Sequence, residues 1–163
     1  MLKSLVLILF LGLIGGCSKS SETPKGLSQF DEVPSLAEAF VLRGDTDAIR
    51  KHTDFTGVPA DALQQVNAML KDWHGVPSSL QLTETKVMTF TEYETLQHED
   101  KKDLPEDMRS ALLSAIRWNV KPEKEIVYTC GIKDPNDTKT RVRWSAGAYK
   151  TNGLWFFAAS YTQ

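Results

Sequence analysis

The 163-residue sequence contains only two cysteines and three histidines. The cysteines, Cys17 and Cys130, lie far apart and fit no metal-ligand spacing. The histidines, at positions 52, 74 and 98, include no pair with the i, i+4 spacing of a metal-binding helix. We therefore expect no metal site in this chain.

An excess of charge of one sign is also missing. The chain has 19 basic and 21 acidic residues, which are mixed along its length and leave a net charge of −2. Proteins that bind nucleic acid carry a basic patch or tail, so we expect no nucleic-acid partner. The sequence also has no Gly-Xaa-Ser-Xaa-Gly elbow, phosphate-binding loop or dinucleotide-binding glycine motif. We therefore expect no cofactor.

The longest apolar run, residues 5–14, is too short to span a bilayer but suits the hydrophobic region of a signal peptide. Lys3 precedes the run, which ends in Leu13-Ile14-Gly15-Gly16-Cys17. This ending resembles the processing site of bacterial lipoproteins. The resemblance implies removal of residues 1–16 and lipidation of the Cys17 sulfur. The alternative is an ordinary secretory signal with an incidental cysteine, or a buried N-terminal helix.

Residues 17–34 are polar and contain Ser, Pro and Gly, which predicts a flexible tether between the lipidated Cys17 and a single domain at 35–163. Two or three acyl chains would anchor the protein stably, at ~0.8 kcal/mol per buried methylene. We expect the protein in the bacterial cell envelope, held to the membrane by this anchor. Ser18 follows the cysteine, and in a bacterium with two membranes the lipoprotein pattern then implies the outer membrane.

The C-terminal stretch 139–162 predicts a β-hairpin around Asn152-Gly153, because Asn-Gly between alternating apolar runs favours a two-residue turn. Such a turn predicts the cross-strand pairs Thr151 with Leu154, Tyr149 with Phe156, Ala148 with Phe157, Ala146 with Ala159, and Trp144 with Tyr161. Alternation then separates an apolar face, expected in the core, from a second face that is more polar.

The apolar hairpin face has alanines among large aromatic side chains, and this leaves space that must be filled. One hypothesis is a site for a small apolar ligand, lined by Trp73, Trp144, Ala146, Ala148, Trp155, Ala159 and Tyr161. The alternative is close packing against a helix through Leu63, Val66, Leu70 and Trp73.

On the second hairpin face, Tyr149 and Phe156 form a cross-strand aromatic pair flanked by Arg141 and Arg143. This composition is typical of a protein interface, so we consider a homodimer or another envelope protein as the partner. A plain sheet surface is the alternative, since such pairs also stabilise isolated sheets.

Upstream of the hairpin, apolar periodicity predicts helices at about 35–44, 45–52 and 59–74, a strand or bent pair of strands at 79–93, a charged loop at 97–103 and a helix from 103. Ser35 and Glu38 predict a capping box at the first helix. A strand at 125–132 joins the hairpin in a three-stranded antiparallel meander, and it makes Cys130 a buried free thiol. The order predicts an α+β domain with N-terminal helices on a curved, mainly antiparallel sheet.

Three stretches, 39–45, 70–78 and 149–155, resemble the first helix, the helix-to-strand passage and the closing hairpin of the nuclear-transport-factor-2-like (cystatin-like) superfamily. The resemblance implies a cone whose enzymes place an acid or histidine deep in the pocket. No acid lies on the apolar hairpin face, and Glu84 has inward strand parity unless the strand bends there. We expect no catalytic residue and a domain that binds a small molecule or a protein. The alternatives are an isomerase or dehydratase, or a structural subunit of an envelope complex.

Overall fold

The structure, a computed structural model, describes residues 23–134, 136–137 and 140–162. The helices within these ranges are α1 (Glu32–Arg43), α2 (Thr46–His52), α3 (Ala60–Asp72), α4 (Phe90–Asp100) and α5 (Glu106–Ala115). The strands are β1 (Thr53–Asp54), β2 (Leu80–Thr89), β3 (Ile116–Trp118), β4 (Lys124–Ile132), β5 (Arg141–Thr151), β6 (Leu154–Ala158) and β7 (Ser160–Thr162). None of these helices is long and apolar enough to cross a membrane.

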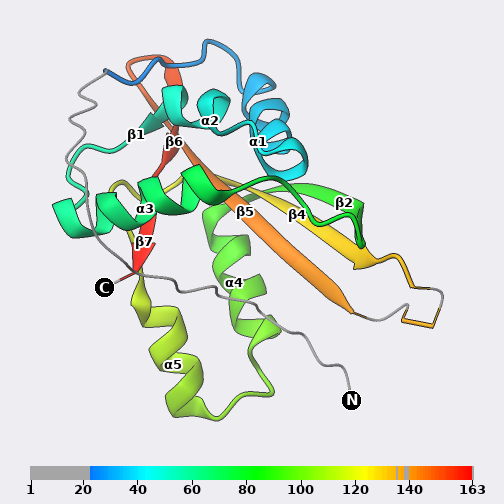
Figure 1. The fold of residues 1–163 in the computed structure, drawn as a ribbon. Coiled ribbons are helices and arrows are strands. Elements are labelled where there is room, and N and C mark those ends of the chain that lie inside the picture. The colour runs from blue at the N-terminus through cyan, green and yellow to red at the C-terminus, as the bar shows by residue number, and fades with distance from the viewer. Residues whose placement is uncertain (1–22, 135, 138–139, 163) are drawn as a thin grey trace.

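The main sheet has the strand order β1-β6-β5-β4-β2, in which β1 runs parallel to β6 and all other neighbours are antiparallel. β3 and β7 form a separate antiparallel pair. The N-terminal helices pack on the main sheet, and α4 and α5 lie below it in the view of Figure 1. The predicted α+β class and the antiparallel meander of β4, β5 and β6 are therefore confirmed.

The core lies between α1 and the face of the sheet that carries the even-numbered residues of β4, called here the inner face. Val33, Ala37 and Val41 of α1 are buried against Ile126 and Tyr128 of β4. The hydroxyl of Tyr128 donates a hydrogen bond of 2.7 Å to the carbonyl oxygen of Pro34, just inside α1. This pairing of helix and strand closes the inner face over the centre of the sheet.

The ends of the first two helices follow the sequence rules only in part. Gly44 ends α1 with a left-handed backbone (φ 69°), and Asp45 caps α2 by accepting a hydrogen bond from the backbone of Ala48 (3.1 Å). The capping box expected at Ser35 is wrong, because α1 begins earlier, at Glu32. Ser35 lies within the first turn, and its hydroxyl donates to the carbonyl oxygen of Asp31 (3.4 Å).

A helix replaces the end of the predicted strand 79–93 and most of the predicted charged loop 97–103. Thr89 caps α4 by accepting from the backbone of Glu92, whose carboxylate in turn accepts from the backbone of Thr89. This capping box starts the helix directly after β2. Tyr93 of α4 is hydrogen-bonded to Ser145 (2.9 Å), so α4 covers the opposite, outer face of the sheet.

The hairpin register is confirmed at its turn and wrong further away. Tyr149 pairs with Phe156 and Ala148 with Phe157, whereas the expected pairs beyond them do not form because β6 ends at Ala158. The backbone of Ala159 instead exchanges hydrogen bonds with Asn119, at 2.9 and 3.1 Å. The chain then leaves the main sheet, and β7 pairs with β3. Ala146 and Trp144 therefore have no hairpin partners at positions 159 and 161.

The folded domain begins before the expected boundary at residue 35. Leu27 exchanges two backbone hydrogen bonds with Trp155 of β6, each 2.8 Å long, and its side chain is buried together with Val33. Residues 25–34 therefore pack with the domain, although the sequence placed them in the flexible tether. Cys17 and the predicted signal peptide lie outside the described residues.

Candidate functional site

The inner face, where a ligand site was expected, is packed by helices. Trp73 contacts Trp144 edge to face with ring centroids 5.7 Å apart, and its indole nitrogen donates to the carbonyl oxygen of Phe40 (2.7 Å). Ala148 is fully buried in the cluster that includes α1, and Ala146 packs against this cluster. The space is filled by α1 together with Leu70 and Val66 of α3, which belong to the packing expected as the alternative to a ligand site.

The remaining residues of the proposed ligand site are dispersed. Trp155 of β6 packs edge to face against Phe30, which precedes α1, with ring centroids 4.8 Å apart. Ala159 lies between β6 and β7, and Tyr161 of β7 pairs with Arg117 of β3. Two shallow, open depressions of the described surface lie elsewhere, one around the N-terminal segment near His52 and one beside β2.

The aromatic pair on the outer face has a partner within the domain. Tyr149 and Phe156 stack with centroids 5.9 Å apart, and Tyr149 is buried. Its hydroxyl donates to Asp54 at the end of β1 (2.5 Å). Burial opposes ionisation of Asp54, but hydrogen bonds from Tyr149 and Thr56 lower its pKa overall. The pair is thus held by an acidic residue that sequence reasoning missed, since β1 is only two residues long.

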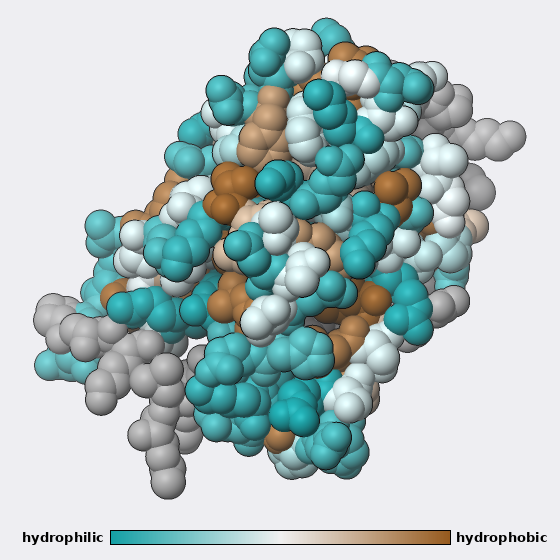
Figure 2. Space-filling view, turned by 180° about the vertical axis from the view of Figure 1, so that it is seen from behind, coloured by the Kyte–Doolittle hydropathy of each residue, from teal (hydrophilic) through white to brown (hydrophobic). Residues whose placement is uncertain are grey.

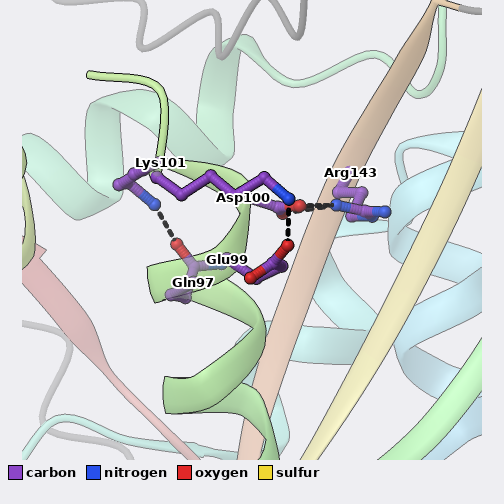
Figure 3. A network of polar contacts seen from close by, with 6 residues as sticks. Gln97, Glu99, Asp100, Lys101 and Arg143 are labelled. Atoms are coloured by element: carbon purple, nitrogen blue, oxygen red, sulfur yellow. Dashed lines mark hydrogen bonds and ion pairs between the residues drawn. The ribbon is translucent and has the colours of Figure 1, made fainter. Parts of the chain in front are cut away.

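The two arginines beside this pair differ in their contacts. Arg143 forms an ion pair with Asp100 at the end of α4, as Figure 3 shows. The next residue, Lys101, is buried and donates to Gln97 one turn earlier, and burial lowers its pKa. Arg141 is exposed and donates to the carbonyl oxygen of Thr140 (3.0 Å). The network in Figure 3 therefore ties α4 to β5, which uses part of the expected interface.

A shallow groove runs beside β2, which is an edge strand because only β4 pairs with it. Val87, 47% exposed, is its most accessible large apolar side chain. The lining residues are Lys86, Val87, Met88, Glu92, Thr95, Leu96 and Glu99. A bulge between Leu82 and Glu84 bends β2, and exposed Glu84 pairs with Lys86 (3.0 Å). This bend, rather than an inward acid, explains the position of Glu84.

The most unusual group in the domain is Glu125, which is 0% exposed. Neither of its carboxyl oxygens has a hydrogen-bond partner among the described residues. Burial raises its pKa to about 8, because a charged carboxylate is poorly stabilised away from water. Tyr93 of α4 lies in the same environment, and its pKa is raised to about 12. Its burial and the nearby Glu125 raise this pKa, whereas the hydrogen bond with Ser145 lowers it.

Alternation along β4 puts Glu125 on the face opposite Ile126 and Tyr128, and nothing in this pattern indicates its burial. β4 is covered on the inner face by α1 and on the outer face by α4, so both of its faces are buried. The apolar or uncharged run 126–132 is the signal that could have shown this, because strands covered on both faces lack clean alternation. Cys130 on the same strand is a buried free thiol, as predicted, and burial raises its pKa.

Side chains that could bind a metal ion do not gather at one point in the described part of the chain. It contains no group of three or more His, Cys, Asp or Glu side chains placed to hold a metal ion. His52 uses its Nδ1 atom to donate to the carbonyl oxygen of Lys25 (2.5 Å), whereas His74 and His98 are exposed.

Comparisons with models of protein families, with curated proteins and with solved structures found no match for this chain. The class of the protein is therefore defined by its fold: an α+β domain with helices packed on a mixed, mostly antiparallel sheet.

Proposed function

We propose that this protein is a lipid-anchored component of the bacterial cell envelope whose domain binds a partner protein without catalysing a reaction. The observation that favours a protein over a small apolar ligand is the closure of the inner face, where Val33 and Ala37 are fully buried under the sheet. The lipid anchor is supported by the apolar run that ends at Cys17.

The groove beside β2 is the proposed binding surface. An edge strand leaves backbone N–H and C=O groups free to pair with an extended segment of another protein. The exposed ion pair of Lys86 and Glu84 discourages strand pairing at the middle of this edge. Val87, near the end of β2, exposes an apolar side chain to solvent. Figure 2 shows the face turned away from the viewer in Figure 1, where hydrophobic side chains form small groups separated by polar ones. This pattern favours a limited contact over a broad apolar interface.

A second proposal is an enzyme of the isomerase or dehydratase type within the nuclear-transport-factor-2-like superfamily. The resemblance of three sequence stretches and the helices packed on the sheet support membership in this superfamily. The buried carboxyl of Glu125 favours an acid–base role, because perturbed acids are common in active sites. However, Glu125 is fully buried, shares the surroundings of Gly147 with Trp118 and Pro122, and lines neither surface depression.

The anchor is tested by the variant Cys17→Ala. We expect the wild-type protein in the membrane fraction and the variant either soluble or unprocessed, because the acyl chains carry the anchoring. Fractionation followed by mass measurement of the N-terminal peptide reads both effects. Cys130→Ala is the matched control and should remain in the membrane fraction. If the Cys17 variant is still cleaved normally and stays with the membrane, the anchor is wrong.

Partner binding is tested by a photo-crosslinking amino acid at Val87 in intact cells. We expect a discrete crosslinked product, whose mass distinguishes a homodimer from another envelope protein. Met69 on α3, which is 57% exposed, is the matched control position and should give no such product. Equal yields of the same product from both positions, or no product from Val87, would contradict binding at the groove.

A further inference from the structure

The environment of the buried Glu125 depends on the absence of a side chain at Gly147, its neighbour on β5. A Cβ atom at Gly147 would lie 2.9 Å from Glu125 Oε1, 2.8 Å from Trp118 Cζ3 and 2.6 Å from Pro122 Cγ. These distances are shorter than real Cβ contacts, so only glycine lets the three groups meet here. The need is one of space, because Gly147 is not among the residues with a positive φ.

Trp118 and Pro122 belong to a short segment, residues 118–122, called here the strap. The side-chain nitrogen of Asn119 donates to the carbonyl oxygen of Asp54 (2.8 Å), which holds the start of the strap. The backbone of Glu123 donates to the carbonyl oxygen of Ala148 (2.8 Å) directly after its end. The strap is therefore tied at both ends, and between them Trp118 and Pro122 approach the same point at Gly147 as the carboxyl of Glu125.

Few groups around Glu125 can compensate a charge. From α4 the titratable neighbour is Tyr93, whose hydroxyl is engaged with Ser145. Lys121 of the strap has its ammonium group over the ring of Phe90, 4.9 Å from the centroid. Glu123, directly after the strap, accepts a hydrogen bond from the backbone of Lys150. The cross-strand neighbours on β2 and β5, Met88 and Gly147, are uncharged.

We propose that Glu125 and the strap form an acid-closed latch, in which the neutral carboxyl is held under Trp118 and Pro122. When the carboxyl gives its proton to the solvent, the carboxylate can be hydrated only if the strap moves away from Gly147. Opening exposes the edge-to-face pair of Trp118 and Phe90, whose centroids lie 6.0 Å apart. The raised pKa of Glu125 agrees with this direction, because the closed state then holds a proton that the open state releases.

The latch is tested by hydrogen exchange on the full mature chain in detergent micelles. Between about pH 5.5 and 7.5, we expect protection of the strap amides, corrected for intrinsic exchange, to fall about tenfold per pH unit. Amides of α1 should exchange more slowly than the strap amides at every pH, because they exchange only when the whole domain unfolds. Glu125→Gln should remove the pH dependence, since the amide has no proton to lose. Glu94→Gln, an exposed acid on α4, is the matched control and should behave like the wild type.

Two further variants separate charge from space. Glu125→Met, which is similar in length and cannot ionise, replaces the glutamine variant should that variant fail to fold. Gly147→Ala should open the strap already at about pH 5.5, because its methyl group occupies the space of Pro122 and Trp118. The latch is refuted by unchanged strap protection across this range in the wild type, or by the same loss in the Gln or Met variant. It is also refuted by full protection in Gly147→Ala, or by strap amides that exchange no faster than those of α1.

Discussion

Replacing Tyr128 with alanine is expected to lower the free energy of unfolding by about 3–5 kcal/mol, the cost of deleting a large buried aromatic side chain. Tyr128 is 0% exposed and lies at the centre of β4, between Thr85 of β2 and Trp144 of β5. Its ring packs in the inner-face cluster, and its hydroxyl reaches the carbonyl oxygen of Pro34 in α1. The substitution removes both contacts and leaves a cavity under α1. Urea unfolding of the two proteins measures the difference.

Tyr128→Phe separates the ring from the hydroxyl. This variant keeps the packing and should lose only about 1 kcal/mol, because the carbonyl oxygen of Pro34 is left without its donor. If the alanine variant is destabilised no more than the phenylalanine variant, Tyr128 does not carry the packing between α1 and the sheet.

The second large effect is a loss of global stability as the pH rises. Glu125 has a pKa of about 8 in the folded state against 4.5 ordinarily, so between these values the folded protein holds a proton that the unfolded chain has released. The free energy of unfolding should therefore fall as the pH rises from about 4.5 to about 8. The full effect is about 4 to 5 kcal/mol, at about 1.4 kcal/mol for each unit of pKa shift.

Glu125→Gln isolates this contribution, because other acids also titrate. The stability of the variant relative to the wild type should increase by about 4 kcal/mol between pH 4.5 and pH 8. Asp54 and Glu92 have lowered pKa values, so their contribution to stability is lost only as the pH falls into the acid range. Both proteins share this contribution, and it cancels in the difference. Urea unfolding at several pH values gives the difference. A constant difference across this range would show that Glu125 ionises in the folded protein much as it does in the unfolded chain.

Local rules predicted the parts of the fold that depend on neighbouring residues. Asn152-Gly153 specified the turn and the first pairs of the hairpin, and Asp45 specified the cap of α2. The same capping rule, applied at Thr89 and Glu92, would have placed α4. It misled at Ser35, where the burial of Val33 carries the helix further toward the N-terminus.

Contacts between distant segments explain what could not be predicted. The end of β6 at Ala158 depends on β1, about a hundred residues earlier in the chain, and on Asn119, which captures the backbone of the next residue. The burial of Glu125 likewise requires α4 and the strap to meet over one position of β4. Neither arrangement leaves a periodic signal in the sequence, and the same holds for the packing of α1 on the inner face.

The attachment of Leu27 to β6 limits how far the domain can stand from a lipid surface. If Cys17 carries the anchor, only the residues before Lys25 link it to the fold, because the backbone of Lys25 already donates to Lys51 (2.8 Å). A fully extended chain covers about 3.5 Å per residue, so this linking segment reaches about 30 Å at most, roughly the width of a small domain. A domain held so close meets partners in or beside the same membrane far more often than partners across a wide compartment.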